Sequence, residues 1–402
     1  RLLDPGSTLA RRDVIAEYVE EVRPLSELAF EVRLKEPVGP FLKLLAHDAL
    51  GIVSPRAFAE EEGKQAFPAG TGPFRLKEWV PGDHLILEAF DGHWRGRPAI
   101  DQVVVVPVPE GSGRAIMLET GAAHLAFPVD PVHLPRLSSL PEVEVVEVPG
   151  LRAIYAAFNL RRPPFSDLRA RRAASHAVDT EAIAERVLFG RAHPLLSPMA
   201  PSVWGYERTS PFAYDPAKAR RLLEEAGIAP GARVELWGPS GRYPQDRAVL
   251  QAVAWYLEAV GFDVHISLFE WATYLSRLAA PAQWDMALLG WVPSTGDADM
   301  ALRPLYHSAA RGNHGGYRNE EVDRLLEEAV REVDEERRLE LYRRVQEAIA
   351  HDAPALLLFS VDMIYARRRE LAGVRALPTE LLDFRFARFD DEPAAHVRGG
   401  SG

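Results

Sequence analysis

Residues 215–237 read DPAKARRLLEEAGIAPGARVELW, which is a helix pattern followed closely by a strand pattern. Asp215 is suited to cap the helix, Pro216 to its first turn and Gly227 to its end. The alternation continues with a helix and two strands, at residues 245–260, 263–269 and 286–292. A βαβαβ run of this kind predicts an α/β fold with parallel strands.

The flanking sequence has a different character. Residues 70–149 are rich in strand patterns: 74–90 predicts a hairpin around Pro81–Asp83, and the apolar run 101–108 predicts a buried central strand. Two helices are expected within residues 319–350, and strands return over 355–389. These changes predict a discontinuous division of the chain, which we place as follows: 1–68, an accessory domain of lobe one; 69–164 with 355–392, lobe one; 165–354, lobe two; 393–402, a tail or linker.

In this division the chain leaves lobe one near Pro163-Pro164 and returns near Pro354. Two crossings form a two-strand hinge, an arrangement that lets two lobes close over a ligand.

Composition excludes several functional classes. The chain has 402 residues, 47% of them hydrophobic and 26% charged, which is typical of globular proteins. A net charge of -11 argues against a nucleic-acid partner, and the absence of cysteine excludes disulfides and thiolate chemistry. No metal-ligand motif is present, so we expect no metal and no cofactor. The 42 Arg against 5 Lys, with 32 Pro, fit a thermophile protein, although a GC-rich genome would also favour Arg and Pro.

Two loops follow neighbouring strands of the predicted sheet. The loop after 234–237 carries Arg242 and Tyr243, and the loop after 286–292 carries Asp297. Ligands of open α/β sheets bind at the carboxyl ends of the strands, so both loops are candidates for a binding site. An Arg can grip a carboxylate and an Asp can accept from an ammonium, which together suit a zwitterion.

Three other interpretations of these residues stay open. Asp297 or Asp299 could simply cap the helix that starts near Met300, and Arg242 could be a solvated loop residue. Asp297 and Asp299 could instead form the carboxylate pair of a hydrolase. Finally, the chain could be a ligand-sensing ectodomain rather than a transport component.

Several motifs, in order along most of the chain, resemble the extracellular solute-binding proteins of ABC importers in the peptide/nickel class, whose dipeptide-, oligopeptide- and glutathione-binding members form one group. The motifs are GTGPF at 70–74 with Trp79, FSDLR at 165–169, YDP at 214–216 with LLEEAG at 222–227, DMALLGW at 285–291 with GDAD at 296–299, and NHGGY at 313–317. The resemblance implies a periplasmic-binding-protein-like fold of class II, without enzymatic activity.

The resemblance also implies residue roles. Asp297 would pair with a peptide's α-amino group, Arg242 and Tyr243 would contact its carboxylate or backbone, and Trp291 would pack against it. Ser294 and Thr295 are candidate polar contacts, and Asn159 is expected to face the cleft near the hinge.

The expected partners are a small peptide-like ligand, held between the lobes, and the ABC permease subunits that receive it. Family members usually carry about a hundred further residues before a segment like 1–7. We therefore expect those preceding residues to form a possible separate chain that partners this one. We also expect a periplasmic or extracellular location, with the signal or lipid anchor lying outside this sequence.

Overall fold

The computed structural model describes residues 3, 13–54, 69–209, 212–280 and 283–390. The predicted tail at 393–402 and parts of the predicted accessory domain lie outside these residues. The chain divides into two compact units: unit 1 contains residues 1–50 and 150–361, and unit 2 contains residues 51–149 and 362–402.

This division differs from the predicted one at both proposed crossings. The chain changes unit at 149/150 and 361/362, not near Pro163-Pro164 and Pro354. The reason is hydrogen bonding. Strands β8 (Ala153–Phe158) and β13 (Ala355–Val361) pair with each other, and β8 also pairs with β12 (Met286–Trp291) of the unit 1 sheet. Residues 1–50 likewise group with the α/β unit rather than with lobe one.

Unit 1 is built on a six-stranded mixed sheet, in the order β11-β10-β12-β8-β13-β9. Strand β10 is parallel to both β11 and β12, which confirms the predicted parallel strands of the βαβαβ run. Strands β8, β13 and β9 extend the sheet by antiparallel pairing. The remaining strands of this sheet are β9 (Ala192–Pro194), β10 (Ala232–Pro239), β11 (Phe262–Phe269) and β12 (Met286–Trp291).

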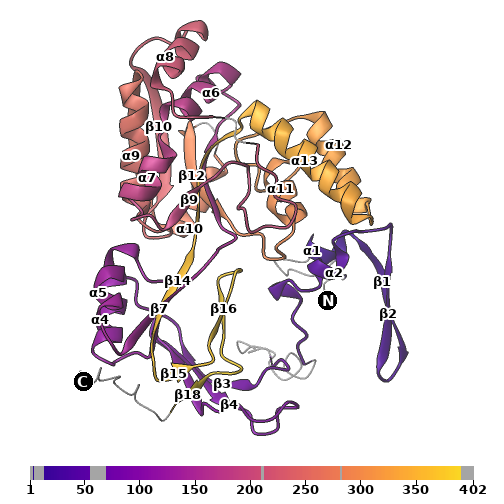
Figure 1. The fold of residues 1–402 in the computed structure, drawn as a ribbon. Helices are drawn as coiled ribbons and strands as arrows, with labels where there is room; N and C mark the ends of the chain where they lie inside the picture. Colours follow the sequence, from indigo (N-terminus) through magenta and orange to yellow (C-terminus); the bar gives the residue numbers. More distant parts are fainter. Residues whose placement is uncertain (1–2, 4–12, 55–68, 210–211, 281–282, 391–402) are drawn as a thin grey trace, which may run out of the picture. The chain divides into compact units, whose positions relative to one another are not determined.

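Helices cover both faces of this sheet (Figure 1). Successive strand residues point to opposite faces, so Leu236 and Leu288 pack in one core while Trp237 and Leu289 pack in the other. The first core takes its helical residues from α6 (Leu168–Ala177), α7 (Thr180–Arg186), α8 (Pro216–Glu225) and α9 (Asp246–Ala259). The second takes them from α10 (Trp271–Leu278), α11 (Ala298–Tyr306), α12 (Glu320–Arg331) and α13 (Glu335–Asp352).

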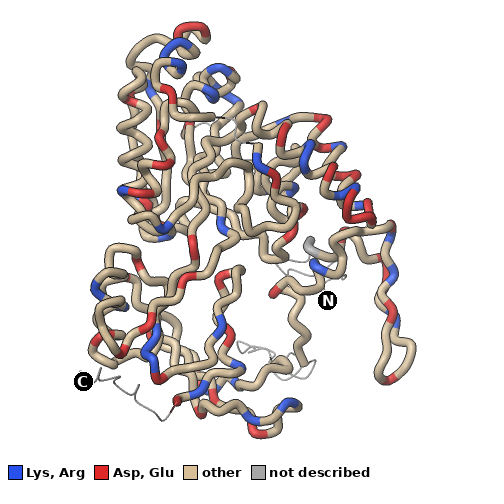
Figure 2. The backbone as a smooth tube through the Cα atoms, viewed as in Figure 1, with Lys and Arg blue, Asp and Glu red and all other residues tan. Residues whose placement is uncertain are grey.

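Helix boundaries follow the capping signals in the sequence. The side chain of Asp215 accepts a hydrogen bond from the Lys218 amide, with Pro216 in the first turn of α8. Asn319 and Asp334 cap α12 and α13 in the same way, as predicted. Acidic residues and arginines alternate along α12 and α13 (Figure 2), and Arg324 pairs with both Glu321 and Glu328.

The amino-terminal part of unit 1 consists of short elements. They are α1 (Asp13–Ala16), β1 (Val19–Ser26), β2 (Ala29–Leu34), α2 (Phe41–Leu44) and the 3-10 helix η1 (Asp48–Leu50). Strands β1 and β2 form an antiparallel hairpin. Tyr18, Val38 and Leu44 pack with Val330 of α12 in a small separate core.

Unit 2 contains the β-rich sequence. The predicted hairpin is confirmed as β3 (Phe74–Val80) and β4 (His84–Ala89), with Gly82 at a φ of 82° in the turn. The expectation of a buried central strand at 101–108 is wrong. Strand β5 (Gln102–Val105) lies at the edge of a three-stranded sheet and is largely exposed, because only β4 pairs with it.

The second sheet of unit 2 joins chain segments on either side of unit 1 in the sequence. Its order is β6-β14-β7, and α4 and α5 contribute to its core through Leu118 and Leu137. The elements are α4 (Gly111–Glu119), β6 (Leu125–Ala126), η2 (Pro131–His133), α5 (Leu134–Ser138), β7 (Val143–Val148) and β14 (Met363–Arg368), followed by the short pairs β15 (Leu371–Ala372) with β18 (Arg388–Phe389) and β16 (Arg375–Leu377) with β17 (Leu381–Asp383).

Candidate functional site

The two predicted loops emerge from the carboxyl ends of β10 and β12, which are neighbours in the sheet of unit 1. The first loop also touches strand β12. The Gly290 amide near the end of β12 donates a hydrogen bond of 2.8 Å to the hydroxyl of Tyr243 in the first loop. A Cβ on Gly290 would lie 2.8 Å from Cε1 of Tyr243, so the contact requires a residue without a side chain. The fold therefore brings Tyr243 to the strand that carries the second loop.

Arg242 is exposed beside this contact. Its guanidinium lies over the ring of Trp271, 5.0 Å from the centroid, and 5.8 Å from that of Tyr243. The loop backbone is fixed because the amides of Arg242 and Tyr243 donate to the buried carboxylate of Asp246, at 2.9 and 3.3 Å. The arrangement presents a cation, supported by aromatic rings, on a loop of defined conformation.

Asp297, by contrast, is completely buried. Oδ1 accepts hydrogen bonds from Arg338 Nη2 at 2.9 Å and from the Asp299 amide at 3.0 Å. Oδ2 accepts from Lys43 Nζ at 3.0 Å. The residue is thus the N-cap of α11, as one of the interpretations left open by the sequence had it, and its carboxylate is engaged within unit 1.

The surroundings of Asp297 explain its burial. Trp204 pairs with the loop like a strand: its amide donates to Gly296 O, and its carbonyl accepts from the Ala298 amide, both at 2.9 Å. The Arg338 guanidinium lies 4.6 Å from the Trp204 ring centroid. The Trp204 ring therefore packs against the buried ion pair of Arg338 and Asp297.

Asp299 is also buried and paired. Arg303 donates to both of its oxygens, Nε at 3.0 Å and Nη2 at 3.1 Å. Each member of the carboxylate pair considered for hydrolysis therefore has a cation of its own.

The other predicted site residues differ in accessibility. Trp291 is half-buried at the end of β12, and its indole NH donates to Met300 O at 2.6 Å. Ser294 and Thr295 are half-buried, and Thr295 Oγ1 accepts from the Asp297 amide at 3.4 Å. Asn159 is fully buried, and its side-chain amide donates to Trp284 O at 2.9 Å. Arg242, Trp291, Ser294 and Thr295 therefore keep surface for a ligand, whereas Asn159 does not.

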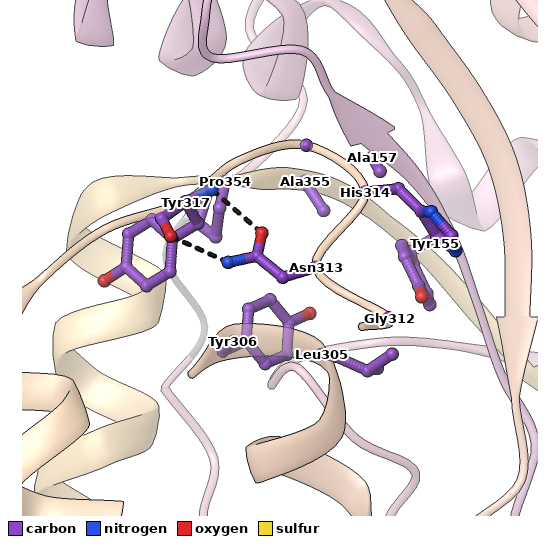
Figure 3. Close-up of a pocket in the computed structure, with 11 residues that line it drawn as sticks. Tyr155, Ala157, Leu305, Tyr306, Gly312, Asn313, His314, Tyr317, Pro354 and Ala355 are labelled. Carbon is purple, nitrogen blue, oxygen red and sulfur yellow. Dashed lines mark hydrogen bonds between the residues drawn. The ribbon is translucent and has the colours of Figure 1, made fainter. Parts of the chain in front are cut away.

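A small cavity in unit 1 was not anticipated from the sequence (Figure 3). It has a volume of about 20 Å³, measured as the space open to the centre of a water-sized sphere. That is room for about one water molecule. The lining residues come from β8, α11, the loop before α12, and the start of β13 with the proline that precedes it: Tyr155, Ala157, Leu305, Tyr306, Gly312, Asn313, His314, Gly315, Tyr317, Pro354 and Ala355.

The chemistry of this cavity is neutral. The buried hydroxyl of Tyr306 has no hydrogen-bond partner among the described residues, and burial raises its pKa. Burial, assisted by Arg161, lowers the pKa of His314. Asn313 is held by Tyr317, whose amide donates to it at 2.9 Å and whose carbonyl accepts from it at 2.7 Å (Figure 3). The cavity lacks the charges and the size that a zwitterionic peptide needs, and no predicted site residue lines it.

The described residues contain no group of three or more His, Asp or Glu side chains placed to hold a metal ion. None of their helices has the length and apolar character needed to cross a bilayer.

Comparison with known proteins now assigns the fold to a family. The model of the bacterial extracellular solute-binding proteins, family 5 (middle domain), matches residues 1–313. The chain belongs to this family of extracellular solute-binding proteins, as the motifs had indicated.

One similar protein is the glutathione-binding protein GsiB of Escherichia coli strain K12. It is 30% identical over 389 residues, which cover 94% of this chain and 75% of the relative.

Two solved structures are similar. One is the ABC transporter-associated periplasmic binding protein DppA of Helicobacter pylori, in complex with the peptide STSA. It matches with a TM-score of 0.83 at 28% identity, and the match covers 93% of this chain and 75% of the DppA chain. The other is the dipeptide-binding protein of Pseudoalteromonas sp. SM9913, in complex with Met-Leu. It matches with a TM-score of 0.85 at 26% identity, and the match covers 94% of this chain and 76% of that protein's chain. All three are named as binding proteins.

Proposed function

We propose that this chain is the substrate-binding component of an ABC importer, that it captures a di- or oligopeptide or glutathione, and that it delivers this solute unchanged to a membrane permease. The relatives support a peptide-like ligand, because one binds glutathione and two were solved with peptides. A periplasmic or extracellular location follows from the same role. Capture between two lobes, expected from the resemblance, stays a prediction.

The observation that carries the proposal is the exposed Arg242 on a hydrogen-bonded loop beside the end of β12. A guanidinium can hold a ligand carboxylate through two parallel hydrogen bonds. Trp291, Ser294 and Thr295 follow on the adjacent strand and loop, where they can contact the rest of a peptide. We therefore assign the carboxylate of the ligand to Arg242.

The role of Asp297 changes in this proposal. A direct contact with a ligand ammonium would require Lys43 to leave Oδ2, because Arg338 and the Asp299 amide already occupy Oδ1. We propose instead that Asp297 acts on the ligand indirectly, by holding the loop that carries Ser294 and Thr295.

Mass spectrometry of material extracted from the purified protein tests the ligand class. The proposal expects a di- or oligopeptide or glutathione, recovered with its mass unchanged. Recovery of a sugar or a metal chelate would contradict the peptide assignment, and recovery of cleaved peptide would contradict a role without catalysis.

A further inference from the structure

The segment at residues 36–44 is fastened to α12. Glu36 accepts from Arg331 Nε at 2.7 Å, and the Gly39 amide donates to Val330 O at 2.9 Å. A Cβ on Gly39 would lie 2.0 Å from the Glu332 carbonyl oxygen and 2.7 Å from Arg338 Cδ. Only glycine allows the segment to come this close, so its path over the helices is narrowly defined.

That path places Lys43 against the buried carboxylate of Asp297. Lys43 Nζ lies 3.0 Å from Oδ2 and 3.9 Å from the centroid of the Trp204 ring. The Lys43 side chain is 35% exposed, whereas that of Arg338 on the other oxygen is 2% exposed. One carboxylate is therefore shared by a fully buried cation and a partly accessible one.

The shared carboxylate also controls the loop that precedes α11. Asp297 accepts from the Asp299 amide, which fixes the start of the helix, and Trp204 binds the backbone on either side of Asp297. Arg338 and Asp299 both hold Oδ1, so Lys43 is the described group that fixes the orientation of Oδ2. The amino-terminal segment thus reaches the loop at residues 292–297 through one charged hydrogen bond. It joins Lys43 to Asp297, which lie 254 positions apart in the sequence.

We propose that Lys43 is a positioning residue for the ligand loop at residues 292–297. Its ammonium holds Asp297 in one orientation, and the loop then presents Ser294 and Thr295 in the geometry that binds the solute. The effect on the solute rests on the proposed function, whereas the effect on the loop does not.

Hydrogen exchange and peptide titration of Lys43→Met test the proposal. Methionine keeps much of the length of the side chain and removes its charge. Lys35→Met is the matched control, because Lys35 adjoins the same segment but donates to the carbonyls of Ala16 and Glu17, at 3.1 and 2.9 Å. Lys43→Arg restores the charge and the hydrogen bond.

We expect amide exchange over 292–299 to be about 10-fold faster in Lys43→Met and unchanged in Lys35→Met, since losing one hydrogen bond to a charged group changes an opening equilibrium by roughly this factor or more. Affinity for the dipeptide Met-Leu should fall by a similar factor, and Lys43→Arg should recover both properties. Unchanged exchange and affinity in Lys43→Met would overturn the proposal, as would equal loosening in Lys43→Arg. If the wild-type chain bound no peptide, the proposed function would fail while the exchange data still decided the role of Lys43.

Discussion

Arg338 Nη2 donates a hydrogen bond of 2.9 Å to Asp297 Oδ1, and both side chains are at most 2% exposed. A buried ion pair is costly to form, and removal of one partner leaves an unpaired charge in a low-dielectric environment. This relationship makes Asp297 part of the framework of unit 1, and it separates the residues that hold the candidate site from those that contact the ligand.

The first prediction concerns stability. Asp297→Ala removes the cap of α11 and leaves Arg338 and Lys43 unpaired, so the free energy of unfolding should fall by about 3–5 kcal/mol. Asp297→Asn keeps an acceptor for the Asp299 amide and should lose less. Urea unfolding of both variants measures the difference. If Asp297 instead contacted the ligand directly, Asp297→Ala would keep wild-type stability and lose only affinity, which would contradict the framework role.

The second prediction concerns binding. Arg242 is exposed, so Arg242→Ala should leave the melting temperature unchanged. Affinity for a dipeptide should fall by roughly 10- to 100-fold, because a hydrogen bond to a charged group contributes about 1.5–3 kcal/mol. Arg247→Ala is the matched control, since Arg247 is exposed in the first turn of α9. Calorimetric titration of the three proteins gives the comparison, and equal affinities would remove Arg242 from the site.

The third prediction is a pH dependence at Asp285. This carboxylate is 2% exposed, and burial raises its pKa against the opposing effects of the Glu235 amide, which donates to it at 2.9 Å, and of Arg162. Because the pKa is raised in the folded state, the stabilising contribution of Asp285 is complete below the ordinary pKa of Asp, about 3.9. It is lost as the pH rises through the folded-state pKa.

Asp285→Asn should therefore melt at a higher temperature than the wild type at pH 7, and the gap should close towards pH 4. Thermal unfolding across this range checks the sign, with the exposed Asp263→Asn as control. A gap that does not change with pH would show that the charge of Asp285 is not the cause.

The fourth prediction concerns acid sensitivity at His176. The ring is 5% exposed, with Nδ1 2.7 Å from Ala213 O, and burial lowers its pKa. The folded chain favours the neutral ring, so the contribution of His176 to stability should be complete above the ordinary histidine pKa, about 6.5. It should fall as the pH drops through the lowered pKa. His176→Asn should weaken this fall between pH 7 and pH 5. The substitution should not abolish the fall in stability, because the pKa of His314 is lowered as well. An unchanged slope would exclude His176 as a contributor.

Much of unit 1 was predictable because its signals are local. Asp215 with Pro216, Asn319 and Asp334 act on amides within three residues, so helix starts follow directly from the sequence. The same holds for the two loops, since parallel neighbours place their carboxyl ends at one edge of a sheet.

The contacts of Asp297 were not predictable, because its partners are distant in the sequence. Lys43 lies 254 residues away and Arg338 41 residues away, and no local pattern links them. Sequence spacing alone left open whether Asp297 caps a helix or meets a ligand. The exposed edge strand β5 shows the same limitation, because an apolar run does not reveal how many strands will pair with it.

Calorimetric titration of the wild-type chain with Met-Leu and with reduced glutathione, followed by mass spectrometry of the released ligand, decides whether this chain binds a peptide-like solute without changing it. We expect saturable 1:1 binding of at least one of these two ligands, with a dissociation constant of roughly micromolar or tighter, and a ligand mass that does not change. The absence of binding to both at millimolar concentration, or release of a cleaved product, would contradict it.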